Sequence, residues 1–363
     1  SIQLELKSLG MHQEHRDTMD QLISKPHGLV LVTGPTGSGK TTSLYACLSK
    51  LYDPRKKIIT IEDPVEYELG GINQIPVNPK RGLTFATGLR AMLRQDPDVI
   101  FVGEIRDTET VDIVIRSALT GHLVFSTLHT NDSISSVSRM IDMGAEPYLV
   151  ASVIEGILAQ RLGRRICDDC RATVPMTEDA RLRLAPEEVD RFDGKMTIGT
   201  GCEKCSNTGF RGRLGFYELI RVQPALRTGI SEGASTIELR KLLGDDFVSM
   251  REDGIRKAIE GITTPEIRTT VPGWTIWDGE CPHGEAGEDV AARARHVIDR
   301  ALAVDGDVAL FSHGHFSRVL AATWLHLSPD CGRFFTLDTG TICVLGYEHE
   351  YRVLKTWNAK VHV

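Results

Sequence analysis

A glycine-rich stretch of nine residues, GPTGSGKTT at 34–42, constrains this chain more than any other feature. An apolar run at 29–32 precedes it, and residues 43–48 continue with helical character. This order of strand, turn and helix is typical of a phosphate-binding loop, because glycines let successive backbone N–H groups point into one concavity. The stretch therefore predicts a nucleoside triphosphate site, with Lys40 as a movable cation for the outer phosphates and Thr41 as a hydroxyl ligand for Mg²⁺. The predicted contacts are Gly34, Pro35, Thr36, Gly37, Ser38, Gly39, Lys40, Thr41 and Thr42.

Acidic residues follow two further apolar segments of the chain. A β-branched segment at 57–61 runs into an acidic stretch at 62–66, and the segment at 99–102 is followed by Glu104. Parallel α/β sheets place their ligands at the ends of strands, so these acids are candidates for holding a magnesium shell or orienting an attacking water. Solvated strand ends are the alternative that the residues alone leave open.

Arginines and histidines accompany these segments. A helical pattern at 84–94 places Arg90 and Arg94 four residues apart, on one face. His122 and His129 flank the apolar segment at 123–125. A lone histidine is more often structural than catalytic, whereas two at one strand leave the structural and the functional interpretation equally open.

Composition bounds the class of protein. The length of 363 residues favours two or three domains, and the net charge of −7 gives no reason to expect nucleic acid as a partner. No apolar run approaches the roughly 20 residues that cross a bilayer, and residues 1–20 carry no signal-peptide pattern, so a cytoplasmic protein is expected. The chain begins at Ser1 without a methionine, as a piece of a longer protein would. Eight cysteines in such a protein suggest metal ligands or buried thiols.

Four ordered motifs make residues 2–262 similar to the secretion ATPase superfamily, the motors of type II secretion and type IV pilus assembly. They are GPTGSGKTT at 34–42, ITIEDPVE at 59–66, LRQDPDVIFVGEIRD at 93–107 and TGHLVFSTLHTNDS at 120–133. The resemblance implies a RecA-like α/β core that hydrolyses ATP with Mg²⁺. It implies Glu66 as the water-activating carboxylate and Glu104 as the magnesium-linked one. The remaining residues that it implies for catalysis are Lys40, Arg106 and His129.

The same resemblance implies a setting for the protein. Members of this family form homo-oligomers, so a hexameric ring is expected, acting at the cytoplasmic face of an inner-membrane secretion or pilus platform, peripheral to that membrane. Arginines such as Arg90, Arg94 and Arg106 are expected to approach a phosphate or a neighbouring subunit. Of the N-terminal half that the family normally carries, only its last part, near residues 1–10, is expected here.

Two cysteine pairs predict a metal site. Cys167 and Cys170 are separated by two residues, as are Cys202 and Cys205, with 31 residues between the pairs. Paired CxxC motifs place four thiolates around one tetrahedral Zn²⁺, which we interpret as structural because no ligand position stays open. Four unrelated thiols are the alternative. The type II class of secretion ATPases carries a similar tetracysteine insert, and the intervening 177–192 is expected to form a loop or helix of its own.

The last hundred residues differ from the rest. All four tryptophans and seven of the twelve histidines lie at 265–363. This tail resembles the C-terminal half of the histidine phosphatases, the phosphoglycerate-mutase-like superfamily. The resemblance rests on TTPEIR at 263–268, GECPHGE at 279–285, an expected strand at 308–311 that runs into SHGH, and an expected closing hairpin at 340–357. The resemblance implies that His313 matches the histidine that contacts the transferred phosphoryl group, and that Glu285 lies in the region of an acid of that site. No Arg-His-Gly turn occurs in the chain, so an inactive tail is expected.

These observations predict an α/β protein in four parts. They are a P-loop core at 1–163, a zinc insert at 164–219, a helical region at 220–262 and a partial phosphatase-like segment at 263–363. The residues EGITT at 260–264 fit both the secretion ATPases and the histidine phosphatases, which suggests a fusion of two gene fragments. The main interpretation is an ATP-driven motor; the alternatives are a phosphatase acting on small phosphate esters and a nucleotide-binding but inactive fragment.

Overall fold

The computed structural model describes residues 5–244, 247–264, 287–310, 312, 314–337 and 341–360. The chain divides into two compact units, Ser1–Thr270 and Val271–Val363. The predicted boundary at 262–263 falls near this division, while the core, the insert and the helical region belong to one unit. No helix among the described residues combines the length and apolarity needed to cross a membrane.

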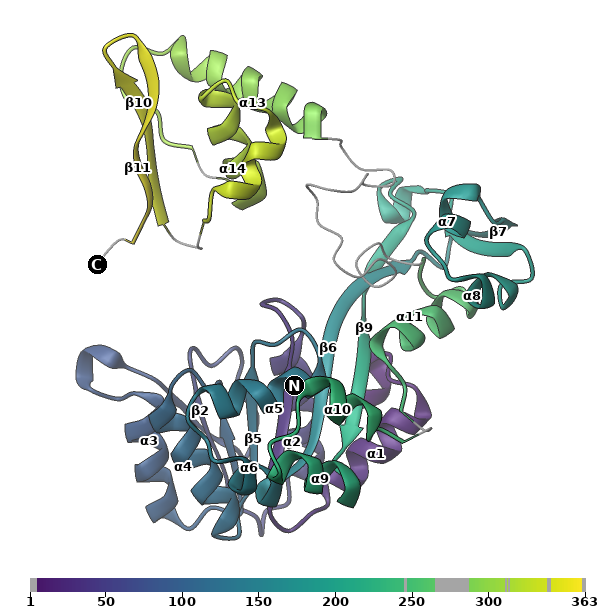
Figure 1. Ribbon diagram of the computed structural model, residues 1–363, viewed down its shortest axis with the longest axis vertical. Helices are drawn as coiled ribbons and strands as arrows, with labels where there is room; N and C mark the ends of the chain where they lie inside the picture. Colours follow the sequence, from purple (N-terminus) through teal and green to yellow (C-terminus); the bar gives the residue numbers. More distant parts are fainter. Residues whose placement is uncertain are drawn as a thin grey trace. The chain divides into compact units, whose positions relative to one another are not determined.

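A seven-stranded sheet forms the centre of the first unit (Figure 1). Its strand order is β3-β2-β4-β5-β1-β6-β9, and every pair is parallel except β6 with β9. The strands are β1 (Gly28–Thr33), β2 (Ile58–Glu62), β3 (Asn73–Pro76), β4 (Val99–Val102), β5 (Leu123–Leu128), β6 (Ile154–Ile166) and β9 (Phe210–Arg221). The mixed α/β class with a parallel sheet is thereby confirmed.

Helices cover both faces of this sheet. Along β1, Leu29 and Leu31 pack into one hydrophobic cluster and Val30 and Val32 into another, so consecutive side chains bury on opposite faces. The first cluster includes residues of α3 (Phe85–Met92), α4 (Thr108–Leu119), α5 (Ser133–Asp142), α6 (Pro147–Val153), α9 (Pro224–Ser231) and Leu239 of α10 (Thr236–Lys241), and the second includes residues of α1 (Gln13–Ile23) and α2 (Lys40–Leu51). The helices α10 and α11 (Met250–Ile259) follow α9.

The helix expected at 84–94 is shorter than predicted. Thr84 caps α3 through a reciprocal bond with Thr87, and after Met92 the chain tightens into the 3₁₀ turn Leu93–Gln95. Asp96 then takes a left-handed conformation with a φ of 51° immediately before Pro97, which ends the helix. The apolar segment at 99–102 forms the strand β4, as expected.

The insert is connected to the central sheet through β6 and β9, the two longest strands of that sheet. Beyond Ala159, β6 leaves its partner β1 and continues with β9 alone, as an antiparallel ribbon. The insert contains a hairpin of β7 (Arg171–Pro175) and β8 (Lys195–Gly199) and the short helices α7 (Glu178–Leu182) and α8 (Pro186–Asp190). Met176, Leu184 and Phe192 from the insert pack against Ile255 and Ala258 of α11. The expected structure within 177–192 is therefore helical.

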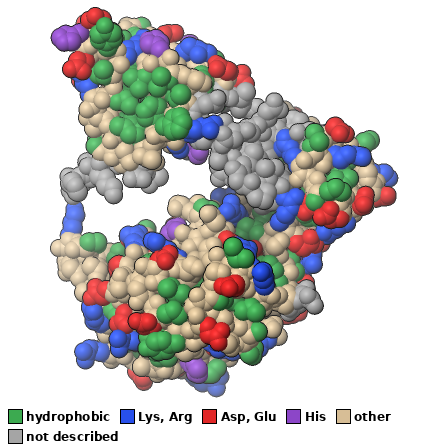
Figure 2. Space-filling view, viewed as in Figure 1, with side chains coloured by type: hydrophobic (Ala, Val, Ile, Leu, Met, Phe, Trp, Pro, Cys, Tyr) green, Lys and Arg blue, Asp and Glu red, His purple; other side chains and the backbone are tan. Residues whose placement is uncertain are grey.

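The second unit packs two helices against a two-stranded ribbon. α13 (Gly287–Leu302) and α14 (Gly314–Trp324) bury Ile298, Leu320 and Trp324 against β10 (Thr341–Glu348) and β11 (Tyr351–Lys360), with the 3₁₀ turn Pro329–Phe334 alongside. The antiparallel pairing of β10 with β11 confirms the closing hairpin. Hydrophobic side chains also gather on the visible face of this unit (Figure 2).

The prediction of a strand at 308–311 is wrong for residues 308–310, which the structure describes. Residues 308–310 form no strand, and Val308 and Leu310 are exposed. A short run of apolar residues gives a strand only where a neighbouring strand pairs with it, and no described strand is paired with this segment. His313, Glu285 and Phe311 lie outside the described residues.

Candidate nucleotide site and cysteine cluster

The loop between β1 and α2 requires glycine at both ends. Gly34 has a φ of 148° and Gly39 a φ of 85°. A Cβ on Gly34 would lie 2.3 Å from the backbone oxygen of Gln160, and one on Gly39 would lie 2.8 Å from the Gln160 side-chain nitrogen. Both glycines therefore let the loop approach β6 closely. Gly39 caps α2, so Lys40 begins the helix whose positive end faces the loop.

Lys40 lies inside this loop. Its Nζ donates hydrogen bonds to the backbone oxygens of Gly34 at 2.8 Å and Pro35 at 3.1 Å, and the side chain is buried. Burial lowers the pKa of Lys40, and the negative charge of Glu104 opposes this shift. The loop carbonyls thus hold the ammonium where an anionic ligand of the loop would meet it.

Glu104, two residues beyond β4, is the centre of a charged group. One carboxylate oxygen accepts a short hydrogen bond from Arg106, and the other lies 3.3 Å from Nε2 of His129. Arg106 also lies 3.4 Å from Asp63, which follows β2. Burial raises the pKa of Glu104, but the hydrogen bond and charge of Arg106, together with His129, outweigh it and lower the pKa overall. Glu104 is therefore held as a carboxylate.

The segment after β5 is tied to the end of β1. The Thr130 N–H donates to the Thr33 hydroxyl at 2.9 Å, and the two hydroxyls lie 2.7 Å apart. This places His129 at the carboxyl end of the strand, beside Glu104. His122 lies at the opposite end of β5, where its Nδ1 is 2.9 Å from the Ser117 backbone oxygen. The two histidines that the sequence singled out are therefore not brought together.

Glu66 lies apart from this charged group. Its side chain is exposed, and its backbone N–H donates to the Tyr45 hydroxyl at 3.3 Å. Among the described residues the structure records no hydrogen bond or ion pair between its carboxylate and Lys40 or Glu104. The role of Glu66 as a water-activating base stays a prediction.

Glu62, in the same acidic stretch, has a different environment. It is 2% exposed and accepts hydrogen bonds from the hydroxyl of Tyr45, from Thr60 at 2.5 Å and from Gln74 at 3.1 Å. Burial and the Glu62 hydrogen bond raise the pKa of Tyr45. Glu62 therefore organises the base of the segment that carries Asp63 and Glu66. The sequence indicated Glu62 and Asp63 only as members of the acidic stretch at 62–66 and gave neither residue a role of its own.

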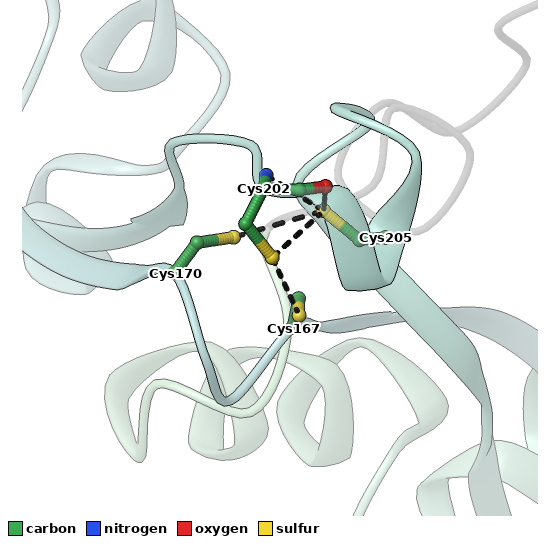
Figure 3. A group of neighbouring side chains, drawn as sticks. All are labelled: Cys167, Cys170, Cys202 and Cys205. Carbon is green, nitrogen blue, oxygen red and sulfur yellow. Dashed lines mark hydrogen bonds between the residues drawn. The ribbon is translucent and has the colours of Figure 1, made fainter.

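The four predicted cysteines form one cluster at the end of the β6–β9 ribbon (Figure 3). All four sulfurs lie within 4.8 Å of one another; the separations are 3.9 Å for Cys167–Cys202, 3.8 Å for Cys170–Cys205 and 3.7 Å for Cys202–Cys205. Sulfurs at Zn–S distances of about 2.3 Å in a tetrahedron lie about 3.8 Å apart. The cluster therefore has the donor set and the dimensions of a four-cysteine zinc site.

The sequence model of the type II/IV secretion system protein family matches residues 1–283. The chain belongs to this family. The model of the histidine phosphatase superfamily, branch 1, matches residues 255–360, in agreement with the fused tail inferred from the sequence.

The chain is similar to proteins named for type II secretion and for type IV pilus assembly. Type II secretion system protein E of Aeromonas hydrophila is 50% identical over 266 residues, which are 73% of this chain and 53% of that protein. The type IV pilus assembly ATPase PilB of Thermus thermophilus is 45% identical over 72% of this chain and 30% of its own length. The chain thus spans about half the length of the type II secretion proteins that it matches.

A solved structure of the pilus retraction motor PilT with bound ADP shares the fold of the first unit. The TM-score is 0.55 at 31% identity, covering 74% of this chain and 67% of that chain. The charged group around Glu104 thus lies in a chain whose relatives are named as ATPases and motors.

Proposed function

We propose that the chain is an ATP-hydrolysing motor of a type II secretion or type IV pilus assembly machine. The observation that carries the proposal is the meeting of Glu104, Arg106, His129 and Asp63 at the carboxyl ends of β2, β4 and β5, next to the loop that holds Lys40. The order β2-β4-β5-β1 makes these strands neighbours. Parallel α/β sheets bind ligands at this edge.

The residues divide the chemistry between them. The backbone of the loop at 34–42 and Lys40 bind the phosphates, and Arg106 supplies further positive charge. Glu66 orients and deprotonates the attacking water, while His129 holds the Glu104 carboxylate in place. The hydroxyl of Thr41 and the Glu104 carboxylate would hold Mg²⁺, since both offer the oxygen donors that this ion prefers. When bound, the ion neutralises charge on the phosphate oxygens.

The cysteine cluster is proposed to hold Zn²⁺ as a structural ion. Four protein thiolates fill a tetrahedral shell and leave no position for a reacting water. Their ion would fix the end of the β6–β9 ribbon and the β7–β8 hairpin in one arrangement.

The names of the relatives support a proposal for the setting of the motor. We infer a homo-oligomeric, hexameric ring at the cytoplasmic face of an inner-membrane platform, peripheral to the membrane, with a RecA-like core and a phosphoglycerate-mutase-like tail. Support comes from the names of the relatives, which describe secretion and pilus ATPases, and from the structural likeness to PilT. The divisions at 163, 219 and 262 belong to the same proposal.

Phosphate release from ATP and from p-nitrophenyl phosphate tests the proposal. Lys40→Ala is expected to lower ATP turnover by at least about a hundredfold, because a charge-stabilising group is lost. The matched control Lys56→Ala removes an exposed lysine outside the loop and is expected to behave as the wild type.

Other results favour the alternatives. Ester turnover abolished by His313→Ala supports the phosphatase that the match at 255–360 suggests. ATP binding without turnover supports an inactive fragment. ATP turnover that survives Lys40→Ala contradicts the motor.

A further inference from the structure

Glu218 on β9 is a buried carboxylate that the proposed mechanism does not use. It is 5% exposed. One oxygen accepts hydrogen bonds from the Ser133 backbone N–H at 3.0 Å and from the Ser133 hydroxyl, and the other accepts the Met250 backbone N–H at 3.4 Å. Among the described residues no lysine or arginine forms an ion pair with it. Backbone donors and one hydroxyl therefore stabilise its charge.

The two backbone donors are the first residues of two different helices. Ser133 begins α5 and Met250 begins α11. Helix N-termini carry partial positive charge and unpaired N–H groups, so each stabilises an anion. Glu218 thus joins the N-terminal ends of α5 and α11 through one carboxylate.

The N-terminus of α5 continues directly from the candidate site. Only Thr130, Asn131 and Asp132 separate His129 from Ser133. Thr130 is bonded to Thr33 at the end of β1, and Asp132 caps α5 by accepting the Ser135 N–H at 2.9 Å. A displacement of His129 therefore acts on the donors that Glu218 holds.

The helix α11, which Glu218 contacts at its N-terminus, is in turn fastened to the cysteine-bearing insert. Arg251 of α11 pairs with Glu188 of the insert at 2.6 Å, and Glu252 pairs with Arg191 at 2.7 Å. Together with the hydrophobic contact of Ile255 and Ala258, these pairs fasten α11 to the insert. Movement of α11 therefore carries the insert with it.

We propose that Glu218 is a positioning residue that couples the nucleotide state read by the His129 segment to α11 and the insert. This inference rests on the proposed function, because it requires the site to bind nucleotide. Coupling of this kind is reciprocal, so the insert also biases the site. In Glu218→Gln an amide NH₂ replaces one oxygen and faces an N–H donor, at α5 or at α11, so one of the two contacts is lost.

Amide hydrogen exchange with and without a non-hydrolysable ATP analogue tests the coupling in the full chain. In the wild type, nucleotide is expected to protect the loop at 34–42 and to change exchange in α11. Glu218→Gln is expected to keep the protection at 34–42 and lose the change in α11. In phosphate release, its kcat is expected to fall about tenfold with KM within about twofold, because substrate binding is unaffected.

Two controls separate coupling from general destabilisation. Glu238 accepts the N–H and hydroxyl of Ser235 in the same manner, so Glu238→Gln is expected to respond as the wild type. Met250→Pro removes the N–H that reaches Glu218 together with the Met250 side chain, at a helix position where proline is tolerated, and Met250→Ala removes that side chain while keeping the N–H. Met250→Pro, but not Met250→Ala, is expected to abolish the response of α11 to nucleotide. These two variants test the coupling if Glu218→Gln does not fold.

The outcomes that overturn the inference are distinct from those that overturn the function. Protection at 34–42 with no response in α11 of the wild type refutes the coupling alone. A full α11 response in Glu218→Gln or Met250→Pro, or an equal loss in the two controls, does the same. A wild type without protection at 34–42 refutes the proposed function and, with it, the coupling.

Discussion

His15 on α1 links the stability of the first unit to pH. Its ring is 4% exposed and lies edge-on to Tyr217 with the centroids 6.4 Å apart. Neither ring nitrogen has a hydrogen-bond partner among the described residues. Burial lowers the pKa of His15 from 6.5 to about 4, with Asp253 opposing the shift and Lys257 adding to it. The folded protein therefore excludes a proton that the unfolded chain binds.

The size of the effect follows from proton linkage. Because the pKa is lower in the folded state, the stability contribution is complete above pH 6.5 and is lost as the pH falls toward 4. A shift from 6.5 to about 4 corresponds to a loss of about 1 kcal/mol at pH 5.5 and about 2–3 kcal/mol at pH 4.5, relative to neutral pH.

Urea unfolding followed by far-UV circular dichroism measures this loss. The comparison is between the wild type and His15→Leu, a side chain of similar volume that cannot titrate. Other histidines, carboxylates and thiols titrate in both proteins, so the difference between the two stabilities isolates His15. We expect that difference to change by about 2–3 kcal/mol between about pH 7.5 and 4.5 in favour of the variant. A difference that stays constant over this range refutes the reasoning.

Three further perturbations have defined outcomes. Glu104→Gln is expected to retain binding of an ATP analogue and to lower kcat for phosphate release by about a hundredfold or more, whereas unchanged turnover contradicts its role. Chelation is expected to release about one Zn²⁺ per chain, detected with a metallochromic dye, and to raise hydrogen exchange in the β7–β8 hairpin; release of none argues against the site. Asp253→Asn is expected to cost about 3–5 kcal/mol in urea unfolding, because Lys257 loses its buried partner at 2.6 Å, and Asp253→Leu with Lys257→Met is expected to cost less than the single change.

The glycine-rich loop and the cysteine cluster could be predicted because short motifs that are continuous in sequence carry them. The loop at 34–42 follows an apolar strand, and the two CxxC pairs predicted a cluster of four thiols, which the sulfurs within 4.8 Å of one another confirm. The strand at 99–102 is buried throughout, so its apolar residues signalled it fully. Boundaries that depend on capping, such as the end of α3, were displaced by a few residues.

Contacts between distant segments could not be predicted in this way. Gln160, more than a hundred residues from the loop, sets the space at Gly34 and Gly39. Glu218 reads in sequence like any strand glutamate between apolar neighbours, and only the fold shows that it meets two helix ends. The segment at 308–310 has an apolar strand pattern, but a pattern cannot supply the neighbour that a strand needs.

The ribbon formed by β6 and β9 is long enough that a small rotation at its base would displace the insert at its tip by a larger distance. Seven residues of β6, from Gln160 to Ile166, extend beyond its last pairing with β1. At about 3.3 Å per residue this is an arm of about 23 Å, so tilting its base by about 10° sweeps its tip through about 4 Å. Gln160, at the base of that arm, touches the phosphate loop. A tilt of the ribbon at its base would therefore displace the cysteines at its tip by a few ångströms.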